Sequence, residues 1–245
     1  MRDALAFLTV LPFLRPPVDT HPAQRMSRAL VWFPVVGALV GASAGAVVFW
    51  ASSRWEYSVA ALLGVVVLSA MTGGLHLDGF SDTVDGLAAR RSGPTQTLQV
   101  MRDSRIGALG CAALFLLLGF KWVLIEAVAT HSLVRVLATA CSFGRFSLVL
   151  SAQSFPYVPG DRGLGRAATD QRSPAAVILA LLITAGVGVA GVGPWNTLLC
   201  LGLTAGLVWI LNRLFLIRLG GITGDTLGAV NEVVEVSILL ALTMR

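Results

Sequence analysis

The sequence predicts an all-α, polytopic membrane protein: one integral membrane domain over residues 1–245 with about seven transmembrane helices. First, hydrophobic residues fill 56% of the 245 positions and charged residues only 13%, against roughly 25% charged residues in a soluble domain. Second, apolar runs long enough to cross a bilayer recur from end to end. Third, the segments between them are rich in glycine, proline and charge, so their backbone groups need partners that hydrocarbon cannot supply.

The N-terminal segment, 1–28, is predicted to form a short interfacial helix that lies on the membrane surface. Its apolar stretch follows Asp3 and is interrupted by Pro12, Pro16 and Pro17, which disfavours a secretory signal peptide. Each following span requires about 20 mostly apolar residues. The seven predicted spans cover residues 30–51, 57–72, 107–125, 133–152, 174–193, 197–217 and 226–243.

Two of these spans depart from the usual pattern. The second is shorter than a bilayer requires, and the last carries Glu232 and Glu235. A charge costs about 2.5 to 3.5 kcal/mol at the membrane centre on insertion scales, so we expect both glutamates to face the protein interior or a wet cavity. Arg135 and Arg145 are their candidate partners.

The arginines predict the orientation, because loops kept in the cytoplasm carry the excess of positive charge. With the N-terminus inside, the opposite side keeps Arg54, Arg245 and Lys121, whose amine would snorkel to the interface. We therefore expect a multi-pass protein of a bacterial inner membrane with its polar motifs in the cytoplasm. The scatter of basic residues over short loops argues against nucleic acid as a partner. The predicted cytoplasmic arginines are Arg2, Arg15, Arg25, Arg28, Arg90, Arg91, Arg102, Arg105, Arg162, Arg166, Arg172 and Arg218.

Three aspartates mark the predicted cytoplasmic motif loop, 73–106. Asp78, Asp82 and Asp85 are spaced four and then three residues apart, which on a helix places them on one face. Like charges in this arrangement repel one another, and a divalent cation with oxygen ligands, Mg²⁺ or alternatively Mn²⁺, would offset the repulsion. The other interpretation is a solvated helix face whose acids pair with neighbouring arginines.

Other polar residues in this segment extend the candidate site. Asp103 is flanked by Arg102 and Arg105. Their planar guanidinium groups can bind two phosphate oxygens at once. The alternative is that these arginines serve only as positive charges that keep this loop in the cytoplasm. His76 is a candidate general base or metal ligand, with a purely structural hydrogen-bonding role as the alternative. Gly79 and Gly86, each of which follows an aspartate, allow a ligand or another helix to approach closely.

A second polar segment precedes the last span. Asp225 and Thr226 stand where a helix is expected to begin, so backbone N–H groups there can face an anion. Asp225 is equally a candidate N-cap. This segment is therefore a candidate second wall of the site.

Four motifs resemble those of the cobalamin synthase family of adenosylcobinamide-GDP ribazoletransferases. They are GLHLDGFSDTVDG at 74–86, MRDSRIG at 101–107, GGITGDTLGA at 220–229 and FPVVG at 33–37. The order and spacing agree along nearly the whole chain. The resemblance implies an integral membrane transferase of a substituted phosphate group that joins adenosylcobinamide-GDP to alpha-ribazole or its 5'-phosphate. The products would be adenosylcobalamin, or its 5'-phosphate, and GMP, with magnesium assistance; a homo-oligomer remains open.

Taken together, these patterns assign a role to each candidate residue. Phosphoryl transfer requires mainly positioning and neutralisation of charge, which matches carboxylates that hold a metal beside arginines that hold phosphate. The predicted metal ligands are Asp78, Asp82, Asp85 and Asp103; the predicted catalytic residues are Asp82, Asp103 and His76; the predicted substrate-binding residues are Arg90, Arg102, Arg105, Asp225 and Thr226.

Two other functions fit part of the pattern. Asp82, Asp85, Gly86, Ala89 and Arg90 match the opening half of the CDP-alcohol phosphotransferase motif, and such an enzyme would release CMP rather than GMP. A proton-coupled transporter would also have many spans and intramembrane acids, but its binding groups usually lie near the midplane within inverted repeats. The dense acids here lie at a predicted membrane boundary.

Overall fold

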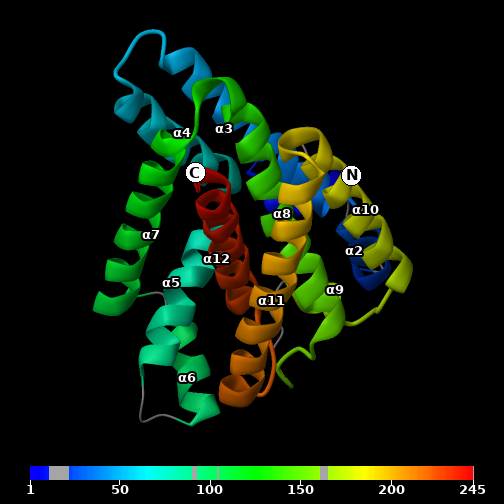
Figure 1. Ribbon diagram of the computed structural model, residues 1–245. Coiled ribbons are helices and arrows are strands. Elements are labelled where there is room, and N and C mark those ends of the chain that lie inside the picture. The colour runs from blue at the N-terminus through cyan, green and yellow to red at the C-terminus, as the bar shows by residue number, and fades with distance from the viewer. Residues whose placement is uncertain (11–21, 90–92, 104, 161–164, 245) are drawn as a thin grey trace.

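The computed structural model describes residues 1–10, 22–89, 93–103, 105–160 and 165–244, and within these ranges the chain is a bundle of α-helices (Figure 1). These ranges contain no strand, only an isolated bridge between Tyr157 and Ile222. The predicted all-α class is therefore confirmed. The helices are α1 (Arg2–Leu8), α2 (Pro22–Leu30), α3 (Phe33–Ala51), α4 (Tyr57–Thr72), α5 (Leu75–Ala88), α6 (Pro94–Met101), α7 (Ala108–Ala127), a 3-10 turn η2 (Thr130–Ser132), α8 (Leu133–Ser154), α9 (Arg166–Thr169), α10 (Pro174–Val192), α11 (Pro194–Leu219) and α12 (Gly224–Thr243).

Six helices, α3, α7, α8, α10, α11 and α12, are long and apolar enough to cross a membrane. Large apolar side chains are exposed on some of them, including Phe115 on α7 and Trp195 and Ile217 on α11, as expected of a surface that faces lipid. The α4 helix has 16 residues and passes as a span only together with α5, from which it is bent by 91°. The prediction of about seven spans thus corresponds to six single helices and one bent pair.

The bend between α4 and α5 lies at a pair of glycines. Gly73 and Gly74 have φ angles of 61° and 71°, a left-handed conformation that glycine adopts without the steric cost that a Cβ atom brings. The α5 helix therefore leaves the axis of α4 and runs toward one end of the bundle (Figure 1). The segment 73–106, predicted as a motif loop, holds both α5 and α6.

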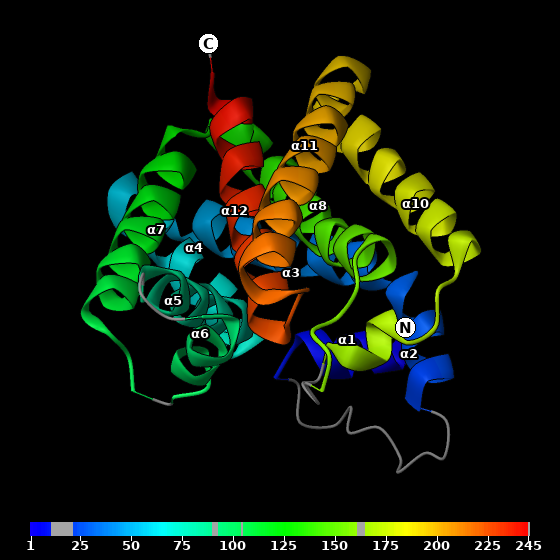
Figure 2. The same cartoon turned by 90° about the horizontal axis from the view of Figure 1, so that it is seen from below.

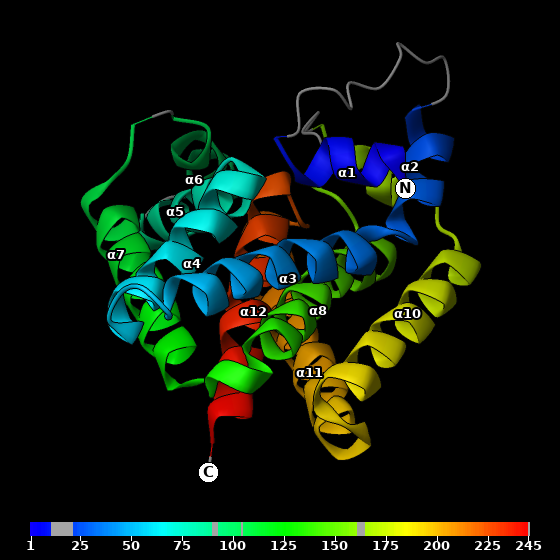
Figure 3. The ribbon, with the colours of Figure 1, turned by 90° about the horizontal axis from the view of Figure 1, so that it is seen from above.

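A stripe of glycines on α3 brings its backbone against that of α8. A Cβ at Gly37 would lie 2.2 Å from the carbonyl oxygen of Cys141, and one at Gly41 would lie 2.1 Å from that of Leu137. Gly45 continues the stripe one turn further on. Small residues at such spacing let two membrane helices pack closely, and Figure 3 shows α3 crossing the bundle beside α8.

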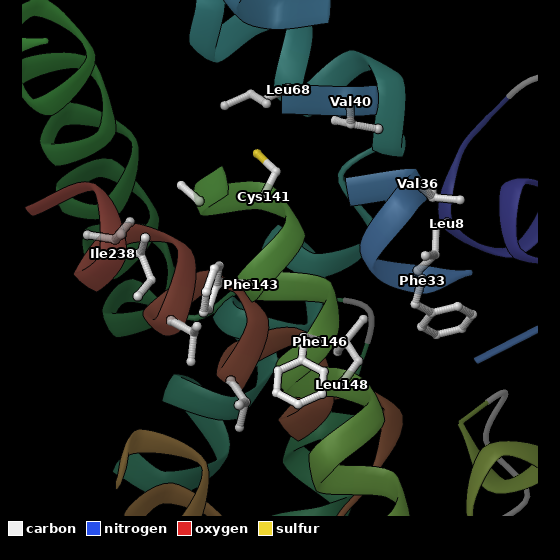
Figure 4. Close-up of a cluster of buried hydrophobic side chains, with 14 of the residues drawn as sticks. Leu8, Phe33, Val36, Val40, Leu68, Cys141, Phe143, Phe146, Leu148 and Ile238 are labelled. Atoms are coloured by element: carbon white, nitrogen blue, oxygen red, sulfur yellow. The ribbon is translucent and has the colours of Figure 1, made fainter. Parts of the chain in front are cut away.

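The α8 helix forms the centre of the bundle and packs against α3, α10, α11 and α12. Its apolar side chains, among them Phe143 and Phe146, are buried. Figure 4 shows them in one cluster with Val40 of α3 and Ile238 of α12. This core fixes the positions of the helix ends that build the site.

Four buried charged side chains lie between α7, α8 and α12. The Lys121 amine is 2.6 Å from Glu232 and 2.7 Å from Glu235, and Glu235 also pairs with Arg145. The prediction that the glutamates face the interior and that Arg145 is a partner is confirmed. The prediction that Lys121 snorkels to the interface is wrong, because its side chain is only 4% exposed and is held by both carboxylates.

Two short helices, α1 and α2, replace the single interfacial helix predicted for residues 1–28. Arg25 on α2 donates hydrogen bonds to the carboxylate of Asp3 on α1, and this holds the pKa of Asp3 below its ordinary value. The predicted cytoplasmic arginines Arg15, Arg90, Arg91 and Arg162, and Arg245 on the predicted opposite side, lie outside the described residues.

Candidate active site

The candidate site lies at the end of the bundle where α7 and α12 begin and where α8 ends. Seen from below, α5 and α6 lie on one side of this end, and α1 and α2 lie on the other (Figure 2). Two neighbouring cavities open between these elements. Six of the ten residues that the sequence predicts to be functional line these cavities: His76, Asp78, Asp82, Arg102, Asp103 and Asp225.

The first, which we name the polar cavity, has a volume of about 330 Å³. It lies among α5, α6 and the start of α7. Its wall combines carboxylates, a guanidinium group and a hydroxyl with a few apolar side chains. The lining residues are Asp78, Ser81, Asp82, Met101, Arg102, Asp103, Ile106 and Leu114.

The second, which we name the apolar cavity, has a volume of about 350 Å³. Carbon atoms make up most of its wall, which includes the stacked rings of Phe7 and Phe33, 5.8 Å apart, together with Leu148 and Ala152 near the end of α8. Its polar groups include His76, Asp78, Arg102, Thr223 and Asp225. Asp78, Met101 and Arg102 line both cavities, so the two cavities share one wall.

The α5 helix carries the predicted acids, as the spacing indicated, and a fourth acid joins them. A Cβ at Gly79 would lie 2.8 Å from the Cα of Asp225, so the backbones of α5 and α12 meet at this glycine. Asp82 interacts electrostatically with Asp78, with Asp225 and with Asp85. Close helix packing thus adds Asp225 to the acidic cluster.

Asp85 differs from its neighbours because the start of α7 binds its carboxylate. The backbone N–H groups of Gly107 and Gly110 donate to its two oxygens at 2.7 and 2.8 Å. A Cβ at either glycine would lie within 2.4 Å of this carboxylate, so only glycine leaves room for it. A carboxylate at a helix N-terminus also opposes the positive end of the helix dipole. Asp85 therefore joins α5 to α7.

Asp103 is paired with Arg105, one of the two arginines that flank it in the sequence. The Arg105 guanidinium donates to both carboxylate oxygens at 2.7 to 3.2 Å, and the Arg105 backbone N–H donates as well. These hydrogen bonds lower the pKa of Asp103 to about 2. Arg105 is 87% exposed in its side chain and does not line either cavity.

His76 lines the apolar cavity and is only 4% exposed. Its Nδ1 atom is buried and has no hydrogen-bond partner within the protein. The ring also lies within electrostatic reach of Arg145, Glu235 and Lys121 in the buried charged group. An unpaired buried nitrogen is costly, and it stands out because the same residue lines the cavity with other atoms of its side chain or backbone.

Asp225 and Thr226, at the start of α12, have different surroundings. Thr223, not Asp225, is the N-cap: its hydroxyl accepts from the Thr226 N–H, and the Thr226 hydroxyl accepts from the Thr223 N–H at 2.7 Å. This reciprocal pair is a capping box. Thr226 is fully buried and its hydroxyl is engaged in the cap, whereas Asp225 lines the apolar cavity.

The sequence as a whole matches one protein family. The family model described as cobalamin-5-phosphate synthase matches residues 1–243. This chain belongs to the cobalamin-5-phosphate synthase family. The resemblance drawn from the four motifs is confirmed, and it covers nearly every element described above.

Three relatives of this cobalamin-5-phosphate synthase family member carry the name adenosylcobinamide-GDP ribazoletransferase. The chain is 38% identical to the one from Escherichia coli (strain K12 / DH10B), with 97% of this chain and 96% of the relative covered. It is 37% identical to one from Klebsiella pneumoniae (strain 342), covering 98% and 97%. It is 30% identical to one from Desulforamulus reducens, covering 100% and 96%. No solved structure matches the chain.

In this member of the cobalamin-5-phosphate synthase family, the site holds residues that the sequence did not connect with it. Phe7, Phe33 and Leu148 come from distant helices, and only the tertiary packing brings them together. Arg90, predicted to bind substrate, lies outside the described residues. Among the residues that the structure does describe, no three His, Cys, Asp or Glu side chains form a group that holds a metal ion by itself.

Proposed function

We propose that this chain catalyses the reaction named for its relatives, joining adenosylcobinamide-GDP to alpha-ribazole or its 5'-phosphate. The products are adenosylcobalamin or its 5'-phosphate, and GMP. Family membership over residues 1–243 supports this proposal, together with the relatives at 30 to 38% identity. The observation that carries it in the structure is a carboxylate-lined cavity sharing one wall with an apolar one.

The polar cavity fits a magnesium ion that arrives with, or is completed by, a diphosphate. Mg²⁺ usually keeps several waters and is held by one or two carboxylates together with substrate phosphates, rather than by a cage of protein ligands. Asp78 and Asp82 both line this cavity and would provide the carboxylates.

The other acids take supporting places in the proposal. The Asp85 carboxylate is already bonded to the start of α7, and that of Asp103 is bonded to Arg105. We therefore assign the first metal ligands to Asp78 and Asp82, and assign Asp85 and Asp103 to the wall that holds them in place. Mn²⁺ would satisfy the same oxygen ligands.

The reaction transfers a phosphorus atom between two oxygens. An alpha-ribazole hydroxyl oxygen forms a bond to the phosphorus nearer the corrinoid, the bond from that phosphorus to the bridging diphosphate oxygen breaks, and GMP leaves with that oxygen. The hydroxyl proton ends in water. Bound magnesium would neutralise the charge of the diphosphate. Arg102 lines both cavities and is therefore placed to hold a phosphate at the junction of the two substrates.

The distribution of arginines supports a cytoplasmic position for the site, in a bacterial inner membrane. The positive-inside rule counts basic residues in short loops near the span ends. On the site side these include Arg102, Arg105, Arg166, Arg172 and Arg218, whereas the other side has Arg54 and Arg135 among the described residues. Protease accessibility of a tag in the connection after α6, in sealed inverted vesicles, tests this orientation.

The test of the reaction uses the purified chain in detergent with adenosylcobinamide-GDP and alpha-ribazole. We expect GMP release that a chelator abolishes and that magnesium restores. Asp82→Asn should lower the rate about a hundredfold or more, as expected when charge stabilisation is lost. Asp170→Asn is the matched control, because Asp170 is exposed, pairs with Arg166 one turn away and lines neither cavity.

Two results would contradict the proposal. Full GMP release in both the chelated sample and Asp82→Asn would remove the metal from the mechanism. Release of CMP from a CDP-alcohol, with no GMP from adenosylcobinamide-GDP, would instead identify a CDP-alcohol phosphotransferase.

A further inference from the structure

The apolar cavity has no role in the proposed chemistry of the diphosphate. It is a cavity of about 350 Å³, at the lower end of the range of roughly 300 to 1,000 Å³ that small-molecule sites occupy. It shares Asp78 and Arg102 with the polar cavity. A molecule bound in it would therefore reach the metal and phosphate site with one end.

We infer that the apolar cavity binds the aromatic base of the nucleoside acceptor, with the ribose directed toward the wall that the two cavities share. This inference rests on the proposed function, and it adds the substrate half that the cavity receives and the residues that select it. Three properties of the cavity support it: its size, the chemistry of its wall and one unpaired buried nitrogen.

Size and chemistry together exclude the other parts of the two substrates. A corrin ring with its amide side chains is far larger than a small-molecule pocket of about 350 Å³. Guanine would bring a carbonyl, an amino group and ring nitrogens, and each polar group left unpaired in an apolar wall weakens binding. The dimethylbenzimidazole of alpha-ribazole is flat, bicyclic and largely apolar, as the wall requires.

The wall offers aromatic and aliphatic surface at one part and polar groups at another. Phe7 and Phe33 stack with their rings 17° from parallel, and Leu148 and Ala152 extend the apolar lining. Aromatic rings favour offset stacked or edge contacts with another flat ring. The polar groups Asp78 and Arg102 then lie where the ribose hydroxyls meet the phosphate.

His76 supplies the independent sign of a ligand. Its Nδ1 is buried without a partner inside the protein, although the residue is only 4% exposed and lines this cavity. Buried polar atoms in native proteins are nearly always paired. This nitrogen has almost no accessible surface in the structure, so a ribose hydroxyl or a ring nitrogen of the nucleoside would complete the hydrogen bond once the imidazole turns toward the cavity, which makes His76 a residue that positions the acceptor.

The test measures binding of alpha-ribazole alone to the purified full-length chain by titration calorimetry, without the diphosphate substrate. Ala152→Phe fills the cavity, since Ala152 lines it, and should weaken alpha-ribazole about tenfold or more, as overpacking does. The matched control is Ala190→Phe on the exposed face of α10, which should leave affinity within about twofold. The riboside of unsubstituted benzimidazole should bind wild type about fifteenfold more weakly, because two buried methyl groups are missing.

A second variant keeps the inference testable if Ala152→Phe does not fold. Leu148→Ala enlarges the cavity, so it should shift preference toward a riboside with a larger, tricyclic aromatic base. Equal affinity for alpha-ribazole in wild type and Ala152→Phe, or an unchanged base preference in Leu148→Ala, overturns the assignment; a cavity that holds a lipid chain instead would give these results. GMP release is measured separately, so a chain that binds alpha-ribazole here but releases no GMP contradicts only the proposed function.

Discussion

Removing Glu235 tests whether the buried charged group is held together by charge balance. The Glu235 carboxylate is 2% exposed and pairs with both Lys121 and Arg145. In Glu235→Gln, Lys121 keeps Glu232 at 2.6 Å, but Arg145 loses its ionic partner while remaining 3% exposed. An arginine cannot escape by losing its proton, so one unpaired cation stays buried.

The expected cost follows from that single unpaired charge. Breaking a buried ion pair by deleting one partner costs about 3 to 5 kcal/mol, which is roughly a hundredfold to several thousandfold in the ratio of folded to unfolded protein. For a chain of this size, it corresponds to a fall of about 6 to 20 °C in the unfolding temperature. Intrinsic fluorescence of the six tryptophans follows thermal unfolding in detergent micelles.

The decisive comparison is the double variant Glu235→Gln with Arg145→Met. It removes the unpaired cation and leaves the neutral pair of Lys121 and Glu232, so it should be more stable than the sum of the single changes by about 2 kcal/mol or more. Glu56→Gln, on an exposed residue, should change stability by less than about 0.5 kcal/mol. Additive losses in the double variant would refute charge balance as the cause.

Three further outcomes follow from the packing and the site. Gly41→Ala should strongly destabilise the α3–α8 contact, because a Cβ there would lie 2.1 Å from a backbone oxygen, whereas Gly202→Ala, with open space around it, should be tolerated in the same thermal unfolding assay. Asp85→Ala loses two hydrogen bonds to a charged group, each worth about 1.5 to 3 kcal/mol, so it should lower the free energy of unfolding by about 3 kcal/mol or more, with or without chelator. A loss seen only without chelator would make Asp85 a metal ligand instead. Arg105→Gln should return the pKa of Asp103 from about 2 toward 3.8, as measured by carboxyl NMR, since its hydrogen bonds favour the ionised form.

Hydropathy predicted the spans because the side chains of each span face either lipid or the protein core, so the span must be apolar along its whole length. The exception is the second span. The sequence shows a mostly apolar run of 16 residues followed by Gly73 and Gly74, but composition alone does not reveal that two left-handed glycines turn the chain by 91°. The bent pair therefore required the backbone geometry.

The site was predictable where its residues are close in sequence. The spacing of Asp78, Asp82 and Asp85 predicted one helix, and α5 has them. Their separate roles depend on contacts between distant helices: Asp85 bonds to the start of α7, and Asp225 joins from α12 because Gly79 lets the two backbones meet. The interpretation of Lys121 failed for the same reason, since its partners lie more than a hundred residues away in the chain.

The buried charged group and the site depend on the same three helices. The α7 helix carries the buried Lys121 midway along its length and binds Asp85 at its start, through backbone N–H groups. The α8 helix carries Arg145 and lines the apolar cavity near its C-terminal end. The α12 helix carries both glutamates and begins beside Gly79. Hydrophobic contacts alone tolerate sliding of one helix along another, because lipid and leucine are equally apolar. If one of these helices slid by one turn along its neighbours, the buried charges would lose their partners. The buried ion pairs therefore fix the relative positions of the helices, and with them the contact of the α5 acids with the starts of α7 and α12. In this interpretation Glu235→Gln should weaken alpha-ribazole binding as well as stability. Gly191→Ala destabilises the contact between α10 and α8, and α10 lines neither cavity, so this variant should leave the affinity of the folded fraction unchanged. Equal effects of the two variants on affinity would contradict the interpretation.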